Sequence, residues 1–178
     1  MQEPTLFLTV GLPGTGKTTA ARVLEEERHA LRLTKDEWMK ALFGPENPSS
    51  ASDVIEGRLI GIALRALELK VNVVLDFGLW SRDERSALRQ AAADVGASVV
   101  MCYFELDPDE QRARLDQRLE EAPHETWPMT DEELVGYTAK FEIPSAAELD
   151  GREPVGPPPE GFANWREWLQ HRWPASAH

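Results

Sequence analysis

The stretch "TLFLTVGLPGTGKTTAARVLEEER", residues 5–28, decides the fold of this chain. Residues 5–10 form a short apolar run with β-branched side chains, which is typical of a buried parallel strand. Residues 20–24 carry apolar side chains at helical spacing, ahead of a cluster of Glu and Arg. A glycine-rich turn lies between the two. Strand, turn and helix in this order predict the first unit of an α/β fold.

The turn itself, "GLPGTGKT" at residues 11–18, matches the motif G-x-x-x-x-G-K-[ST]. Glycines let successive backbone N–H groups point at phosphate oxygens, and the next helix adds unpaired donors and the positive end of its dipole. Lys17 would place a cation on the β- and γ-phosphates of ATP, and the Thr18 hydroxyl would ligate Mg²⁺. We expect these residues to contact the nucleotide: Gly11, Pro13, Gly14, Thr15, Gly16, Lys17, Thr18 and Thr19.

Further strands alternate with helical patterns along the chain. Residues 30–34, 71–77 and 97–106 are expected to be strands. Three capping-box pairs predict helix starts: Ser81 with Glu84, Asp107 with Glu110, and Thr130 with Glu133. The pattern predicts a three-layer P-loop NTPase fold, with a parallel sheet of four to five strands flanked by helices and a helical lid at about residues 108–128.

Two acidic residues follow predicted strands, where parallel sheets place their binding chemistry. Asp36 comes after the second strand, and could either complement a helix dipole or accept the proton of a substrate hydroxyl as general base. Asp76 ends the third strand, in the usual place of the second acidic element of a P-loop site. It could hold Mg²⁺ through water, or hold the substrate hydroxyl and a cationic side chain.

Composition narrows the class of partner. The chain has 178 residues and is 42% hydrophobic, which suits one compact domain with at most a small appendage. Its formal charge of -12 disfavours nucleic acid and anionic membrane as partners. No run of 18 apolar residues occurs, and "MQEPTLFLTV" lacks the features of a secretory signal, so we expect a cytoplasmic protein without a membrane partner.

Absent motifs narrow the class of P-loop protein. The sequence has no N-K-x-D motif for guanine and no L-S-G-G-Q-like signature, and it is short for a two-part ring ATPase. Single-domain chains built on this loop are most often small kinases.

The chain also resembles a known group of proteins. The segments "GLPGTGKTT", "TKDEW", "VVLDFGLWSRDER", "RARLDQRLE" and "MTDEELVGYTAKFEIPS" are similar to the small P-loop kinases of the AAA-type ATP-binding family. That group includes the 5'-hydroxyl kinase domain of polynucleotide kinase, chloramphenicol phosphotransferase and zeta toxins. The resemblance spans about residues 5–145. It implies Lys17 and Thr18 at the phosphates and Mg²⁺, Asp36 as general base, and Arg118 as a lid arginine.

The predicted lid carries cations that could serve the reaction. Arg114 and Arg118 are four residues apart, so they share one face of the helix expected at 108–121. They could be surface cations among acidic neighbours, or they could meet the transferring phosphoryl group when a lid closes. We take both as candidate catalytic residues.

The acceptor is the least defined part of the site. Polynucleotide kinases place an arginine three residues after the base, where this chain has Met39, and residues 36–53 are mostly acidic or apolar. A small, neutral or cationic hydroxylated substrate fits a cleft lined by this segment better than nucleic acid does. An apolar surface for it was expected from Trp38, Met39, Phe43, Leu79 and Trp80.

We therefore expect an ATP-dependent phosphotransferase that moves the γ-phosphoryl group to a hydroxyl of a small molecule. The alternatives are a nucleotide-dependent ATPase or switch acting on a protein partner, and a 5'-hydroxyl nucleic-acid kinase. Residues 1–145 would form the kinase core with its lid. Residues 146–178 would add a Pro-rich loop and an aromatic C-terminal helix packed on the core, in a monomer or homodimer.

Overall fold

A parallel four-stranded sheet forms the centre of the protein, in the order β2-β3-β1-β4. The computed structural model describes residues 3–123 and 126–176. The strands are β1 (Thr5–Val10), β2 (Leu31–Thr34), β3 (Val73–Asp76) and β4 (Ser98–Tyr103). This confirms the α/β fold class and the parallel sheet, with four strands in the described part of the chain.

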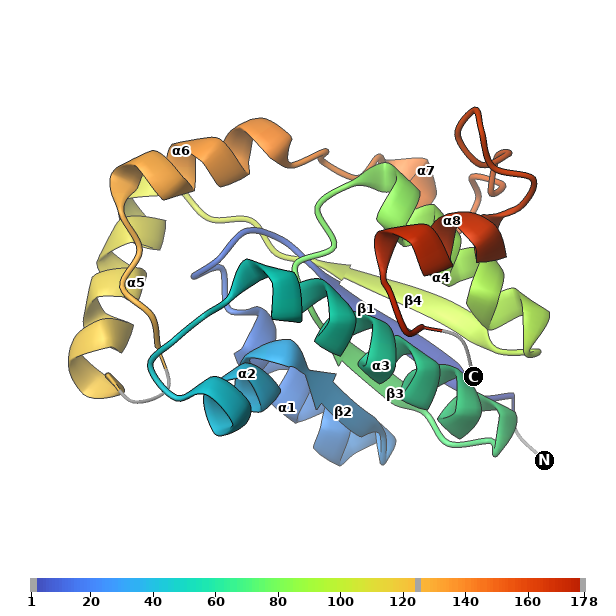
Figure 1. Ribbon diagram of the computed structural model, residues 1–178, viewed down its shortest axis with the longest axis horizontal. Coiled ribbons are helices and arrows are strands. Elements are labelled where there is room, and N and C mark those ends of the chain that lie inside the picture. The colour runs from blue at the N-terminus through green and yellow to red at the C-terminus, as the bar shows by residue number, and fades with distance from the viewer. Residues whose placement is uncertain (1–2, 124–125, 177–178) are drawn as a thin grey trace.

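Helices follow the strands and lie on both faces of the sheet, with α1 on one face and α3 and α4 on the other (Figure 1). Their bounds are α1 (Lys17–Arg28), α2 (Lys35–Phe43), α3 (Ser49–Glu68), α4 (Arg82–Asp94), α5 (Pro108–Glu121), α6 (Asp131–Lys140), α7 (Ala146–Leu149) and α8 (Trp165–Arg172). Phe7 and Val74 point toward α1 and pack with Ala21, whereas Leu6 and Leu75 point to the other face, where α3 and α4 complete the larger core. Alternating side chains of buried strands thus feed two hydrophobic layers.

The helix starts follow local capping chemistry. Ser81 and Thr130 each form the predicted reciprocal box with the glutamate three residues later. Asp107 does not: Pro108 occupies the first helical position, and the Asp107 carboxylate accepts from the backbone N–H of Asp109 at 3.0 Å. The predicted box with Glu110 is wrong, although α5 begins where it was expected.

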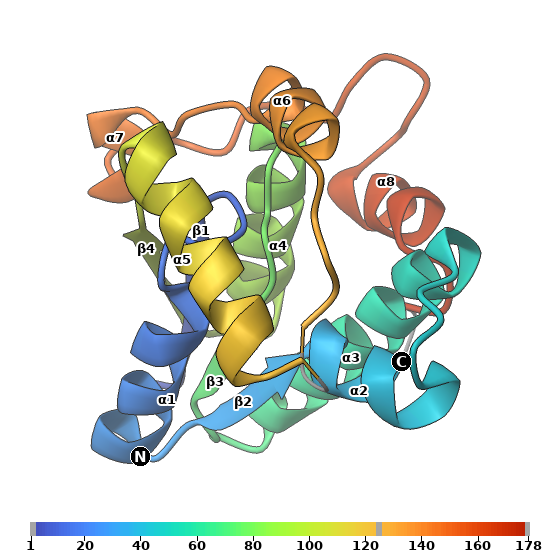
Figure 2. The same cartoon turned by 90° about the vertical axis from the view of Figure 1, so that its left-hand side faces the viewer.

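Helices α5 and α6 form an arch beyond the carboxyl ends of the strands (Figures 1 and 2). Helix α5 falls within the lid range expected from the sequence, about residues 108–128, of which residues 124 and 125 lie outside the described residues; α6 lies beyond that range. We refer to α5 and α6 as the lid helices. In residues 3–123 and 126–176, no helix is both long enough and apolar enough to cross a membrane.

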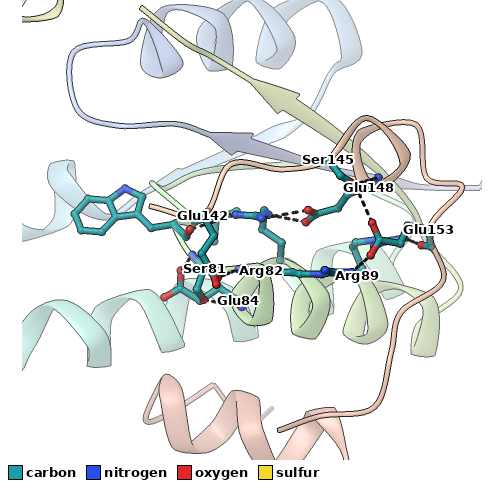
Figure 3. Close-up of polar contacts among 11 residues, drawn as sticks. Ser81, Arg82, Glu84, Arg89, Glu142, Ser145, Glu148 and Glu153 are labelled. Atoms are coloured by element: carbon teal, nitrogen blue, oxygen red, sulfur yellow. Dashed lines mark hydrogen bonds and ion pairs between the residues drawn. The ribbon is translucent and has the colours of Figure 1, made fainter. Parts of the chain in front are cut away.

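A buried ion pair fastens the chain after the lid to α4. Arg85 and Glu148 form two hydrogen bonds, at 2.6 and 3.2 Å, with side chains only 1% and 3% exposed. Figure 3 shows the surrounding contacts, in which Arg82 and Arg89 of α4 reach Glu153. Arg85 also donates to the carbonyls of residues 79 and 80, so the Arg85–Glu148 pair, which we call the clasp, holds the loop that leaves β3.

The C-terminal helix α8 packs on α3 and α4. Its aromatic side chains belong to the main core, and Trp173, just past its end, is 1% exposed. Arg172 ties this end to two helices, at 2.7 Å from the Asp53 carboxylate of α3 and 2.8 Å from the Glu84 carboxylate of α4. The chain end beyond α8 is thereby held against α3.

Candidate active site

A pocket of about 440 Å³ brings the predicted site together at the carboxyl ends of the strands. The P-loop, α2, α3, the loop after β3 and both lid helices contribute to its walls. Of the residues expected from the sequence, these line it: Pro13, Gly14, Gly16, Lys17, Thr18, Thr19, Asp36, Asp76, Arg114 and Arg118.

Gly11 and Thr15 shape the P-loop from outside the pocket lining. A side chain at residue 11 would lie 2.5 Å from the backbone oxygen of Phe104, and φ is +151° there, so glycine is required. The Thr15 hydroxyl donates to the carbonyl of Leu12 at 2.8 Å. These contacts hold the loop turn that precedes α1, and the Gly11 N–H is itself bonded to the Gly78 carbonyl at 3.2 Å, so phosphate would meet the N–H groups later in the loop.

Lys17 is the half-buried cation of the loop. Its Nζ donates to the Leu12 carbonyl at 2.7 Å. Burial lowers the pKa of Lys17 from 10.5 to about 8, opposed by the carboxylates of Asp76 and Asp36, while Arg118 lowers it further. A buried cation that has lost its water gains strongly from an incoming phosphate.

Asp76 connects the loop to a cation that the sequence analysis did not assign. Its carboxylate lies 3.4 Å from the Thr18 hydroxyl and 3.4 Å from an Arg32 nitrogen. Burial raises the pKa of Asp76, against the opposing effects of Thr18 and Lys17. Arg32 of β2 also pairs with Glu25 and Glu37. Of the two roles considered for Asp76, the contact with a cationic side chain is therefore present.

Asp36 lies at the start of α2 and lines the same pocket. Its side chain is 54% exposed, and its carboxylate lies 3.6 Å from Lys35 Nζ. Glu56 of α3 also lines the pocket, 3.7 Å from the same ammonium. Sequence reasoning missed Lys35 and Glu56, because Glu56 sits within an ordinary amphipathic helix pattern and its proximity to Asp36 arises only in the folded chain.

The lid arginines face the P-loop. Leu115 packs where a side chain on Gly14 would stand, at 2.9 Å, and Gln111 donates to the Pro13 carbonyl at 2.6 Å, so α5 rests on the loop. Arg114 and Arg118 line the pocket from this helix, whereas Arg112 turns away to Asp116 and Asp131. The separation of helical faces that the spacing predicted is present.

The aromatic wall differs from the expected one. Met39 and Leu79 are buried in the core, 0% and 4% exposed, and Trp38 is 46% exposed outside the pocket lining. The aromatic residues of the lining are Phe77, Trp80, Trp127 and Tyr137, and of these only Trp80 was expected on the acceptor wall. Trp80 contacts Tyr137 of α6 with ring centroids 4.7 Å apart. The expectation failed for α2 because its apolar side turns to α3 rather than to the pocket.

Comparison with known proteins agrees with this arrangement. A family model described as an AAA domain matches residues 6–144. No curated protein matches the sequence significantly. Solved structures with the same fold include a chain of the Pnkp1/Rnl/Hen1 RNA repair complex, with 19% identity and a TM-score of 0.61 over 87% of this chain and 48% of that chain. The present chain thus spans about half the length of that relative.

Two other solved structures match over nearly the whole of both chains. Chaetomium thermophilum Kti12 in complex with ADP-AlF3 is 21% identical, with a TM-score of 0.63 over 97% of this chain and 100% of that chain. A protein of Chloroflexus aurantiacus, provisionally described as a kinase, is 18% identical, with a TM-score of 0.64 over 96% and 97%. At these identities the likeness concerns the fold.

Proposed function

The chain belongs to the AAA domain family, and from this we propose that it transfers the γ-phosphoryl group of ATP to a hydroxyl of a small molecule. One observation carries the proposal: a single pocket is lined by the P-loop lysine, the carboxylate of Asp36 at the start of α2 and two lid arginines. The Asp36 carboxylate has only a weak partner, because the nitrogen of Lys35 lies 3.6 Å away. A protein that only bound nucleotide would have no use for such a carboxylate in the pocket.

Each residue then has a separate task in the transfer. Lys17 and the P-loop N–H groups hold the β- and γ-phosphates. The Asp36 carboxylate accepts the proton of the acceptor hydroxyl and orients its oxygen toward the γ-phosphorus. Arg114 and Arg118 offset charge on the transferring group from the lid side. The acceptor oxygen forms a bond to the γ-phosphorus, the bond between that phosphorus and the bridging oxygen breaks, and ADP leaves.

The residues around Thr18 fit a magnesium ion. The Thr18 hydroxyl and the Asp76 carboxylate, 3.4 Å apart, are oxygen donors of the kind that Mg²⁺ prefers. Thr18 and Asp76 would hold the ion, which would supply positive charge that offsets the charge of the phosphates. Arg32 holds the second Asp76 oxygen, at 3.4 Å, and so orients the carboxylate toward Thr18.

The test is an ATP-consumption screen followed by an active-site variant. The compounds are D-glucose, D-glucosamine, adenosine, kanamycin, chloramphenicol and a 5'-hydroxyl oligonucleotide, with transfer measured from γ-labelled ATP. For whichever acceptor is labelled, Asp36→Asn should lower kcat by about 10² or more while leaving ATP affinity nearly unchanged. Glu46→Gln, at an exposed residue outside the pocket lining, is the matched control.

The other outcomes identify the alternatives. ATP hydrolysis without labelling of any compound would favour a nucleotide-dependent module with a protein partner. Labelling of the oligonucleotide alone, weakening steeply with salt, would indicate a nucleic-acid kinase. Normal transfer by Asp36→Asn would overturn the assignment of the base.

A further inference from the structure

Glu56 is a pocket carboxylate for which phosphoryl transfer, as described above, has no use. It lies on α3, its side chain is 14% exposed, and it lines the pocket together with Asp36 and Lys35. A carboxylate this sheltered from water needs partners, and burial raises the pKa of Glu56. Its position on the Asp36 side, among residues of α2 and α3, places it near the acceptor rather than at the P-loop.

The two oxygens of this carboxylate have different surroundings. Oε2 accepts a 2.7 Å hydrogen bond from the indole N–H of Trp173. Oε1 lies 3.7 Å from Lys35 Nζ, which is an ion pair but longer than a hydrogen bond. Among the described residues, none donates a hydrogen bond to Oε1. One oxygen is therefore fixed by the protein, and the other retains its capacity to accept.

The segment that fixes Glu56 is itself firmly seated. Trp173 is 1% exposed, and the preceding residue, Arg172, bonds to both Asp53 and Glu84. Directly after it, the chain runs so close to α3 that a side chain at Gly57 would lie 2.1 Å from the Pro174 backbone oxygen. The orientation of the carboxylate is thus set by a part of the chain that lies outside residues 6–144, the range of the family match.

We propose that Glu56 recognises a hydrogen-bond donor on the phosphoryl acceptor, and that Trp173 is the positioning residue that aims the Glu56 carboxylate. The inference rests on the proposed function. The acceptor then carries a hydroxyl or protonated amine in addition to the reacting hydroxyl, as polyols and amino alcohols do. An anionic group at this position would face Glu56 and Asp36 with Lys35 already shared between them.

Three variants separate positioning from stability. Trp173→Phe keeps an aromatic ring in the core but removes the N–H donor. Trp165→Phe is the matched control, because Trp165 is also buried and belongs to the same hydrophobic core. Its indole N–H donates to the Gly156 carbonyl at 2.7 Å, away from the pocket. Glu56→Gln keeps the shape of the side chain and removes its charge.

The measurements are KM for the acceptor, KM for ATP and kcat, using D-glucose, D-glucosamine, adenosine, kanamycin and chloramphenicol as acceptors. Trp173→Phe and Glu56→Gln should raise acceptor KM by about tenfold or more, the scale of a lost hydrogen bond to a charged group. The KM for ATP should stay within about twofold, and Trp165→Phe should resemble wild type in all three quantities. A larger effect of Glu56→Gln on glucosamine than on glucose would identify the donor as an ammonium group.

The outcomes that overturn the inference differ from those that overturn the function. If wild type labels an acceptor and Glu56→Gln has unchanged acceptor KM, the inference fails and the phosphotransferase stands. If wild type labels none of the compounds, the proposed function fails and the inference with it. Calorimetry checks folding, and should Trp173→Phe not fold, Glu56→Gln alone decides.

Discussion

Lys17 shows how a single residue is prepared for its ligand. Its ammonium donates to a carbonyl of its own loop at 2.7 Å, and burial brings its pKa to about 8. Phosphate oxygens would replace that carbonyl with full negative charge. Because its pKa is lowered, Lys17 is only partly protonated at pH 8, and a bound phosphate would favour its protonated form.

This arrangement predicts proton uptake when ATP binds. Between pH 8 and 9 much of free Lys17 is neutral, because its pKa is lowered, and the phosphates favour the charged form. ATP affinity should therefore fall as pH rises through 8. Titration calorimetry at pH 8.5, in two buffers of different ionisation enthalpy, should show net proton uptake. Lys17→Met should show none; equal uptake by this variant would assign the proton to another group.

The motif residues could be predicted because their spacing alone defines their chemistry, as for Lys17 and Thr18. Asp36 and Asp76 could be placed because parallel strands end at one edge. Glu56 could not, since its partner Trp173 lies 117 residues later in the chain. The same holds for Arg32, whose contact with Asp76 depends on which strands become neighbours.

At the scale of elements, the close contact between α3 and the C-terminal segment predicts that Gly57 cannot be replaced by alanine without loss of stability. Gly57 lies in α3, and Gly136 lies in α6, where no atom would meet an added side chain. Alanine favours a helix over glycine, so Gly136→Ala should raise the free energy of unfolding by about 0.5–1 kcal/mol. Gly57→Ala should instead lower it by about 1–3 kcal/mol through overpacking against Pro174. Urea denaturation of both variants measures the two signs; stabilisation by Gly57→Ala would contradict the close approach.

The clasp between α4 and α7 predicts a second contrast at this scale. Glu148→Gln leaves Arg85 buried without its counter-charge and should cost about 3–5 kcal/mol of unfolding free energy. The exposed pair Arg152–Asp150 offers the comparison, and Asp150→Asn should change stability by less than about 1 kcal/mol. Chemical denaturation distinguishes them. Equal effects would mean that the clasp is hydrated in solution.

For the whole molecule, α5 rests on the P-loop through Leu115 and Gln111, whereas α8 is anchored on α3 and α4. A non-hydrolysable ATP analogue should therefore slow amide exchange in residues 11–18 and in α5, and leave α8 nearly unchanged. Hydrogen-exchange mass spectrometry measures this. Protection spread evenly over the chain would show that nucleotide tightens the fold as one unit.

The late position of Trp173 also has a consequence for how the protein comes into being. Synthesis proceeds from the amino end, so the P-loop, Asp36 and the lid leave the ribosome before the residue that aims Glu56 exists. If Glu56 recognises the acceptor as proposed, the residues that would bind nucleotide are synthesised before the residue that orients the acceptor-binding carboxylate. A protease cut in the Pro- and Gly-rich stretch at residues 151–161 that released α8 would remove Trp165, Trp168 and Trp173 from the main core, so it should cost stability as well as the orientation of Glu56.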